Sequence, residues 1–184
     1  MSRCQWAEGA GPKMQHYHDT EWGREERNET KLFELLTLEG FQAGLSWKLV
    51  LNRREALRAA FFDYNIYTLS KLSDHQLQTL LDRPGMLKNR LKVFSVRTNA
   101  LALLQLKKEF KDLGTYLWGF DPAFPHISRR SKDDTPVCES PLSRAIAIDM
   151  KRRGFKFVGP KIIYSLMQAA GLVNDHEKEC MLCQ

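Results

Sequence analysis

The sequence predicts an all-α fold in a single domain. Apolar residues recur at the three- and four-residue spacing of helices. The sustained alternation of polar and apolar residues that is typical of strands does not occur. Capping residues, prolines and glycines divide the chain into successive helices. The chain has 184 residues, of which 43% are hydrophobic, so it is long enough to bury a core without disulfides.

Two helices are expected in the first third of the chain. The first covers residues 29–42, where leucines and Phe33 form an apolar side, and Gly44 ends it. Ser46 is a suitable N-cap for a second helix that runs to Phe61.

Two helices joined by a short Pro-Gly hairpin are predicted next. Ser73 and Gln76 have the spacing of a capping box, and Pro84-Gly85 interrupts the helix that they start. A long helix is then expected over residues 88–110. Its first N–H groups are a potential phosphate site, close to Lys88, Arg90, Lys92 and Arg97. An ordinary turn with a solvated basic face is the alternative interpretation.

The last third of the chain combines an irregular stretch with two more helices. Residues 121–140 are predicted to be a loop. Ser140-Pro141 starts a helix that ends at Gly154, and Gly159-Pro160 starts another that ends near Gly171.

Two cysteines and two histidines near the chain ends have the composition of a structural zinc site. Cys4 and His18 lie near the start, and His176 and Cys180 lie near the end. The four-residue spacing of the second pair would place both side chains on one face of a helix. Spacing alone does not choose between Cys180 and Cys183 as the fourth ligand, and disulfides are the alternative use of these thiols. Four protein ligands would close the site and make the metal structural.

Aromatic residues gather near the proposed ligands. Three of the four tryptophans lie in the first 47 residues, at Trp6, Trp22 and Trp47, with Tyr17 beside His18. They are either core residues or the walls of a stacking pocket for a flat ligand, which a cationic ring would suit through cation–π attraction.

Glu39 is the leading candidate for the acid of such a pocket. It lies near the end of an apolar helix, where the helix dipole disfavours an acid. A buried carboxyl group there would accept a hydrogen bond or stabilise positive charge, whereas an exposed one would have no special role. Asp19 and Glu21 are the alternatives, and either could orient His18.

Charge and hydropathy limit the possible partners. The formal net charge is +6 and the pI is about 9.2, which is compatible with nucleic acid or with a merely basic enzyme. No apolar run approaches a membrane span and no leader is expected, so the predicted location is the cytoplasm or nucleoid. The sequence contains no nucleotide-binding glycine loop, so an ATP-driven enzyme is not expected.

Five blocks of sequence resemble the bacterial 3-methyladenine DNA glycosylase I family. They are Arg3-Cys4-x-Trp6, Tyr17-His18-Asp19-x-Glu21-Trp22-Gly23, residues 38–47, residues 151–159 and residues 167–176. Together they span the chain, and the combination is highly specific. Two positions depart from the family pattern: Met14 replaces an aromatic residue, and the hairpin over residues 83–90 differs from the usual Ala-Gly-Ile-Ile-Arg type.

The resemblance implies a helix-hairpin-helix glycosylase with a two-lobed domain over residues 1–184 and its helix-hairpin-helix motif at about residues 74–98. A structural Zn²⁺ would join the terminal segments 1–24 and 172–184 through Cys4, His18, His176 and Cys180. The expected activity is excision of 3-methyladenine from alkylated double-stranded DNA, leaving an abasic site without strand cleavage, by a monomer.

The resemblance also implies roles for individual residues. Glu39 would be catalytic, and Tyr17, Trp47, Trp6 and Trp22 would bind the base. Gly44 and Leu45 would enter the DNA stack, while Gly85, Lys88 and Arg90 would contact the backbone. The competing hypotheses are a zinc-stabilised binder of alkylated DNA without turnover and, less consistent with four strong ligands, a hydrolase with an open zinc.

Overall fold

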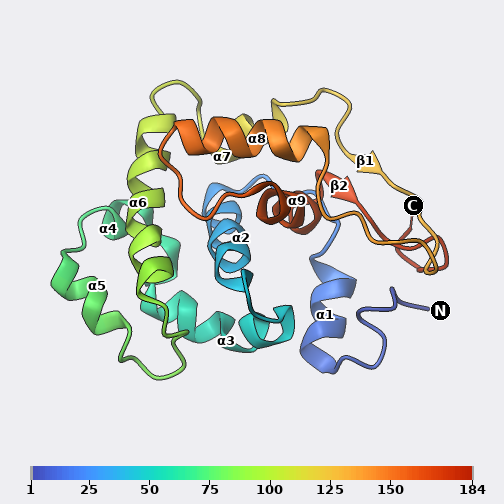
Figure 1. The fold of residues 1–184 in the computed structure, drawn as a ribbon, viewed down its shortest axis with the longest axis horizontal. Coiled ribbons are helices and arrows are strands. Elements are labelled where there is room, and N and C mark those ends of the chain that lie inside the picture. Colours follow the sequence, from blue (N-terminus) through green and yellow to red (C-terminus); the bar gives the residue numbers. More distant parts are fainter. Residues whose placement is uncertain (1, 184) are drawn as a thin grey trace.

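Helix α2 (Glu29–Gln42) lies at the centre of the fold, surrounded by other helices (Figure 1). In the computed structural model, which describes residues 2–183, every residue from Leu32 to Phe41 is buried. The predicted bounds of this helix are confirmed, but it is covered on all sides rather than one, because α3, α6, α7 and α9 all pack against it. Polar residues on such a helix need partners or a function.

Residues 2–183 form nine α-helices, one short 3-10 helix and two strands, so the all-α prediction is confirmed. The other α-helices are α1 (Pro12–Thr20), α3 (Trp47–Ala60), α4 (Ile66–Leu69), α5 (Asp74–Leu80), α6 (Arg90–Leu106), α7 (Leu113–Trp118), α8 (Pro141–Arg152) and α9 (Pro160–Ala169). The 3-10 helix is Phe62–Tyr64, and β1 (His126–Ile127) pairs in parallel with β2 (Val173–Asn174).

Local capping signals account for the helix starts that the sequence predicted. The Ser46 side chain accepts a hydrogen bond from the Leu49 N–H at 3.2 Å and so starts α3. Ser73 and Gln76 form a complete capping box at the start of α5. These bonds lie within one turn, so they need no tertiary contact.

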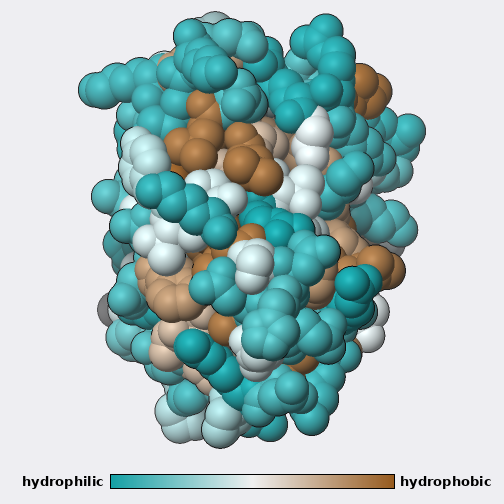
Figure 2. Space-filling view, turned by 90° about the vertical axis from the view of Figure 1, so that its left-hand side faces the viewer, coloured by the Kyte–Doolittle hydropathy of each residue, from teal (hydrophilic) through white to brown (hydrophobic). Residues whose placement is uncertain are grey.

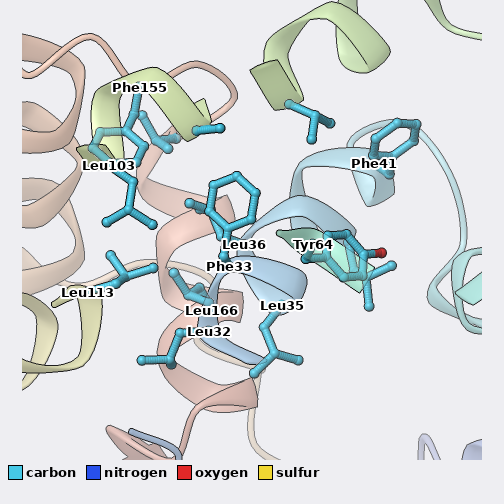
Figure 3. Close-up of a cluster of buried hydrophobic side chains, with 14 of the residues drawn as sticks. Leu32, Phe33, Leu35, Leu36, Phe41, Tyr64, Leu103, Leu113, Phe155 and Leu166 are labelled. Atoms are coloured by element: carbon cyan, nitrogen blue, oxygen red, sulfur yellow. The ribbon is translucent and has the colours of Figure 1, made fainter. Parts of the chain in front are cut away.

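The main core forms around α2 (Figure 3). Phe33 and Leu36 of α2 lie in one cluster with Leu103 of α6, with Leu166 of α9 and with Phe155, which lies between α8 and α9. Each such side chain, fully buried, contributes about 1.5–3 kcal/mol. The position of α2 is therefore fixed by apolar contacts with elements from both halves of the chain.

The hairpin between α5 and α6 packs on α3. Gly85 has a φ of +80°, and a Cβ there would lie 2.7 Å from the Cβ of Ala56, so only glycine fits this turn. Helix α6 is shorter than the predicted range 88–110. It begins after Asn89, whose side chain caps it, and it ends where the chain turns back at Lys107.

The elements that the sequence did not predict are short. Helix α7 has six residues and α1 has nine, so neither repeats an apolar pattern for long enough to be recognised. The strand β1 lies in the predicted loop 121–140, and two residues leave no visible alternation.

The two chain ends lie side by side (Figure 1). Ser2 and Cys180 form an isolated parallel bridge, and the Met181 N–H donates to the Ser2 carbonyl at 3.0 Å. The side of the molecule at the left of Figure 1 is mostly hydrophilic, with small separate hydrophobic patches (Figure 2). Among residues 2–183, no helix has both the length and the apolar character that crossing a membrane requires.

We expect Gly171→Ala to destabilise the protein much more than Gly9→Ala. Both glycines have a left-handed φ, +73° and +68°, so both variants carry the same backbone strain of about 1–2 kcal/mol. A Cβ at Gly171 would also lie 2.3 Å from the carbonyl carbon of Arg24, whereas Gly9 has open space. Urea unfolding should show a loss of about 3 kcal/mol or more for Gly171→Ala; equal losses in the two variants would contradict the close approach.

Candidate active site

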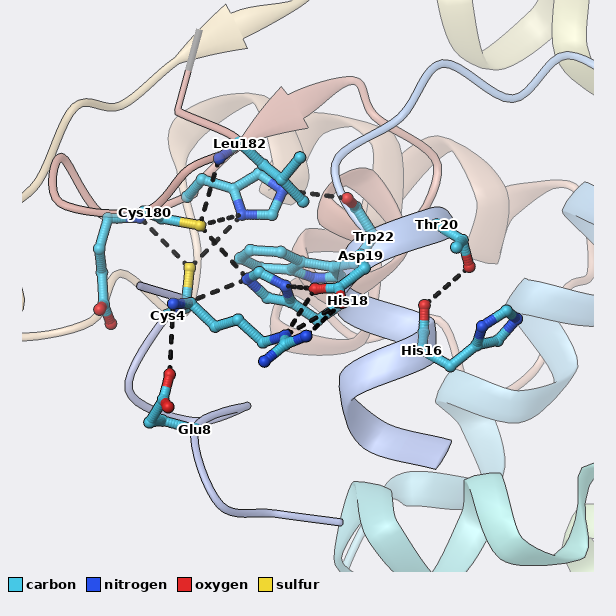
Figure 4. A network of polar contacts seen from close by, with 12 residues as sticks. Cys4, Glu8, His16, His18, Asp19, Thr20, Trp22, Cys180 and Leu182 are labelled. Carbon is cyan, nitrogen blue, oxygen red and sulfur yellow. Dashed lines mark hydrogen bonds and ion pairs between the residues drawn. The ribbon is translucent and has the colours of Figure 1, made fainter. Parts of the chain in front are cut away.

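Four ligand side chains from the two chain ends meet in one buried cluster (Figure 4). The donor atoms of Cys4, His18, His176 and Cys180 lie within 4.8 Å of one another. The Cys4 Sγ is 3.4 Å from the His176 Nδ1, and the Cys180 Sγ is 3.5 Å from the His18 Nε2. A tetrahedral ion with bonds of about 2.3 Å to sulfur and about 2.1 Å to nitrogen has S···N edges of roughly 3.6 Å. The cluster therefore fits a metal ion.

Hydrogen bonds orient both imidazoles toward the centre of the cluster. The His18 Nδ1 lies 2.8 Å from the Asp19 carboxylate, and Arg3 holds that carboxylate with bonds of 2.8–3.0 Å. The His176 Nε2 lies 3.1 Å from the Trp22 carbonyl. Partners of this kind set the tautomer and direction of metal-binding histidines. The prediction that a carboxylate orients His18 is confirmed, and Asp19 supplies it.

Burial disfavours charge on the side chains of this cluster. Burial raises the pKa of the Cys4 thiol to about 12 and lowers the pKa of His176 to about 4. His176 is therefore neutral, with a free lone pair, and a bound cation would reverse the preference of the thiol by favouring the thiolate.

The prediction that His176 and Cys180 share a helix face is wrong. The segment is an irregular turn in which the Cys180 N–H donates to the Glu177 carbonyl at 2.8 Å. The N-terminal segment stabilises this turn. The Glu177 N–H donates to the Cys4 Sγ, and the Glu177 carboxylate accepts from the Gln5 N–H. Cys180 supplies the fourth donor atom of the cluster, and Cys183 is not one of its members.

Aromatic rings connect this cluster to a cavity. The Trp22 ring contacts the His176 ring with centroids 4.7 Å apart, and it contacts Trp6 at 5.1 Å. On the other side, Tyr17 and Trp47 lie 5.1 Å apart. The cavity of about 750 Å³ is lined by all four of these tryptophan and tyrosine residues.

The cavity is formed by two parts of the chain, residues 5–47 and residues 130–177. Helix α1 contributes Tyr17 and Met14, α2 contributes Glu39 and Gln42, and α3 contributes Trp47 at its first turn. The remaining walls come from α9, from the loop over residues 130–138 and from the segment after β2. A cavity of this size is large enough for a nucleobase.

Glu39 is a buried acid of this cavity that has no charged partner. Its side chain is 4% exposed, and burial alone raises its pKa to about 8. Burial and then the charges of Glu39 and Glu21 raise the pKa of the Tyr17 phenol well above its ordinary value, so that phenol stays a hydrogen-bond donor.

A second buried acid on the same helix shows why Glu39 is unusual. Glu34 is 2% exposed, and burial also opposes its charge, but bonds from Arg54 and Arg58 outweigh that effect and lower its pKa to about 2. Glu21 is bound by Arg54 at 2.8 Å. Of the three acids considered from sequence, Asp19 and Glu21 are thus engaged by arginines, and Glu39 is the one without a charged partner in the structure.

Three unsatisfied polar atoms belong to residues of this cavity. Among the residues that the structure describes, the buried side-chain atoms without a partner are the Glu39 Oε2, the Trp47 Nε1, the Asp175 Oδ1 and the Tyr64 hydroxyl. The first three residues line the cavity. Buried polar groups are normally paired, so these three atoms are available to a ligand or to water in the cavity.

Sequence reasoning gave no role to Asp175. Its Oδ2 accepts bonds from the Tyr164 hydroxyl at 2.9 Å and from the Gln168 amide at 2.6 Å, and its Oδ1 has no partner. The available signal was an acid next to a proposed ligand, in Asn174-Asp175-His176.

An exposed leucine lines a smaller cavity that shares Glu39 and Gln42 with the large one. The loop between α2 and α3 turns at Gly44, with a φ of +78°, and leaves Leu45 39% exposed. A smaller cavity of about 180 Å³ is lined by Leu45, Glu39 and Lys161, among others, so the leucine and the acid border the same space.

The hairpin contains fewer free cations than the sequence indicated. Lys88 and Arg90 are exposed, and the Arg90 guanidinium lies 4.2 Å from the centroid of the Phe94 ring. Lys92 is buried, and Arg97 is bound to the Leu72 carbonyl and to Asp74. These last two side chains are therefore engaged by partners within the protein, which leaves Lys88 and Arg90 as the exposed cations of the hairpin.

Comparison with known proteins identifies related chains. The family described as methyladenine glycosylase matches residues 6–184. DNA-3-methyladenine glycosylase 1 of Escherichia coli (strain K12) is 37% identical over 180 residues, which cover 98% of this chain and 96% of the relative. A crystal structure of 3-methyladenine DNA glycosylase I has a TM-score of 0.94 at 38% identity and covers 100% of both chains. A variant of 3-methyladenine DNA glycosylase I in complex with 3-methyladenine has a TM-score of 0.94 at 28% identity and covers 100% of this chain and 98% of its own.

We expect Glu39→Gln to become more stable relative to the parent protein as pH rises from about 4.5 to about 8. In this window the folded parent keeps a proton on Glu39 that the unfolded chain has lost, since the pKa rises from 4.5 to about 8 on folding. Raising the pH therefore lowers the free energy of unfolding of the parent, by up to a few kcal/mol, and glutamine removes this dependence.

Urea unfolding of both proteins at intervals between pH 4.5 and pH 8 measures the difference. A constant difference over that range would mean that the folded protein does not raise the pKa of Glu39.

Proposed function

The chain belongs to the methyladenine glycosylase family, and we infer that it is a DNA-3-methyladenine glycosylase, a hydrolase of N-glycosyl bonds. The observation that carries this inference is the buried, unpartnered carboxyl group of Glu39 in an aromatic cavity. Such a cavity suits a flat, cationic base better than a neutral one. The substrate that we propose is alkylated double-stranded DNA, and the products are free 3-methyladenine and an abasic site.

The substrate nucleotide must leave the duplex before it can enter the cavity. Flipping costs roughly a few kcal/mol, and damage that weakens pairing lowers this cost. We propose that Leu45, presented by the turn at Gly44, fills the space in the base stack. Its exposure and its position next to Glu39 at the small cavity support this role.

Stacking and charge would then hold the base. We propose that Tyr17 and Trp47 stack on it, that Trp6 and Trp22 complete the aromatic wall, and that Glu39 accepts a hydrogen bond from the exocyclic amine. A unit charge about 4 Å away contributes about 4 kcal/mol at an effective dielectric constant of 20. This is comparable to the cost of ionising Glu39 in the empty cavity. A cationic base would therefore ionise Glu39, whereas a neutral base would not.

The proposed reaction is hydrolysis at the C1′ carbon of the sugar. The bond from C1′ to the base breaks, and its electron pair goes to the base, which leaves as neutral 3-methyladenine. A water oxygen bonds to C1′ and releases a proton. The positive charge of the substrate already weakens the bond, so no lysine nucleophile is required and no strand cleavage is expected.

The hairpin would hold the DNA backbone. We propose that the exposed Lys88 and Arg90 contact phosphates beside the turn at Gly85. Contacts of this kind position the duplex and make binding depend on salt.

We propose Zn²⁺ as the ion of the Cys/His cluster. Two thiolates and two imidazoles in a closed tetrahedral arrangement are typical of structural zinc. The bound ion would neutralise the thiolates and link the chain ends, while the surrounding residues position Trp6, Tyr17 and Trp22 at the cavity. We further propose that the enzyme acts as a monomer, because one chain supplies all these residues, and that it works at the nucleoid in the bacterial cytoplasm.

A binding module for alkylated DNA is the competing function, and release of free base distinguishes the two. With methylated duplex DNA, we expect chromatography to detect 3-methyladenine from the parent protein. We expect Glu39→Gln to lower the excision rate on the order of 100-fold. Glutamine cannot carry the negative charge that Glu39 would gain beside the cationic base.

Glu55→Gln is the matched control, since Glu55 is an exposed acid of α3 that does not line the cavity. It should excise at the parental rate. Parental excision by Glu39→Gln would remove Glu39 from the mechanism, and no release by the parent would favour the binding module.

We expect borohydride treatment during the reaction to trap no covalent complex. Reduction captures an imine between a lysine and C1′, and hydrolysis by water forms none. A trapped complex on a denaturing gel would show instead that a lysine attacks the sugar.

We expect one zinc ion per chain in the parent protein and in Cys183→Ser, and none in Cys180→Ser. Both changes remove one thiol from the same terminal segment, but only Cys180 belongs to the cluster. Loss of the metal should lower the melting temperature, because metal binding contributes to folding free energy. Unchanged melting after complete chelation of the parent would contradict a structural zinc.

A further inference from the structure

A lysine in the first turn of α6 is buried. Lys92 is 5% exposed, and its ammonium group donates to the Phe41 carbonyl at 2.8 Å and to the Ala43 carbonyl at 2.5 Å. Lysine is rarely buried unless its charge is paired, and here its partners are backbone oxygens. The burial therefore points to a specific role.

The position of Lys92 is unfavourable for its own helix and favourable for another. A cation in the first turn opposes the dipole of α6, whose first turn contains no acid. The same cation lies at the C-terminal end of α2, where the dipole attracts positive charge. The last carbonyls of a helix have no helical N–H partner, and Lys92 supplies two donors there.

These two carbonyls belong to functionally important backbone. Phe41 is two residues after Glu39, and Ala43 directly precedes Gly44 and Leu45. The loop has few other restraints: the Leu45 N–H donates to the Gln42 carbonyl at 2.7 Å, and the space around Gly44 is open. The two bonds from Lys92 thus attach the loop and the end of α2 to the first turn of α6.

The other side of this turn is the hairpin. Asn89 accepts the Lys92 N–H at 3.1 Å, and Arg90 follows it in the exposed part of the turn. One turn of α6 therefore connects the proposed phosphate contacts to the loop that carries Leu45.

We propose that Lys92 is a positioning residue, which holds the loop of Leu45 in register with the hairpin so that DNA bound at the hairpin meets the leucine at the right place. This proposal rests on the proposed glycosylase function. Lys92 itself contacts neither base nor phosphate, because its ammonium group is buried among carbonyls. Its loss should therefore affect excision from duplex DNA more than binding of the free base.

A double-mutant cycle of Lys92→Met and Leu45→Ala tests this coupling, with single-turnover excision from methylated duplex DNA as the readout. We expect each single variant to lower the rate about tenfold or more. If Lys92 acts through Leu45, the double variant should lie within about twofold of the slower single variant. Multiplication of the two losses would overturn the proposal.

Two further measurements separate positioning from other roles. Affinity for free 3-methyladenine should stay within about twofold of the parent in Lys92→Met, and a loss in parallel with excision would mean a general structural role and overturn the proposal. The slope of the logarithm of the DNA-binding constant against the logarithm of salt concentration should equal that of the parent. A slope smaller in magnitude by about one would mean that Lys92 contacts a phosphate, and this result would also overturn the proposal.

Controls keep the test decisive. Lys108→Met removes an exposed lysine just beyond the far end of α6 and should leave excision unchanged. If Lys92→Met does not fold, Lys92→Gln keeps an N–H donor and enters the same cycle. Failure of the parent to release base would refute the glycosylase function, whereas additive losses with an active parent would refute only the role of Lys92.

Discussion

Desolvation of the Glu39 carboxyl group is the constraint on which the site depends. Glu34 and Glu39 are both buried on α2, but their pKa values move in opposite directions, to about 2 and about 8. The difference comes from partners, because arginines surround Glu34 while burial acts alone on Glu39. An unpaired acid in the core costs stability when it is ionised, and a positive charge in the cavity would offset that cost.

The rest of the cavity is held in place from two directions. Apolar contacts fix α2, and with it Glu39, at the centre of the molecule. The Cys/His cluster joins the chain ends and orients the segments that carry Trp6, Tyr17 and Trp22. The Cys/His cluster is therefore part of the support of the cavity, and an aromatic layer lies between the two.

The last turn of α2 has three structural roles. It presents Glu39 to the cavity, it leads into the loop of Leu45, and its carbonyl oxygens face Lys92. Backbone groups at a helix end lack internal partners, so this is a natural place for a contact from another element. The hairpin and the loop of Leu45 can be coordinated through this contact without any direct interaction between their side chains.

Features that depend on local interactions could be predicted from the sequence, whereas features that depend on long-range contacts could not. The caps at Ser46 and Ser73 and the bounds of α2 follow from residues within a turn of one another, so the sequence alone determined them. The blocks shared with the glycosylase family likewise identified the cluster and Glu39. Short elements such as α7 had too few residues for a periodic signal, and their place depends on the core that they cover.

Which charged side chains have a charged partner depends on contacts in the folded protein. Glu21 and Glu39 are both glutamates near aromatic residues, but Arg54, from a distant part of the chain, binds one and not the other. Lys92 similarly has the sequence context of a phosphate contact, yet packing turns it inward onto the end of α2. The physical reason is that burial and pairing are set by neighbours far along the chain, which no local pattern records.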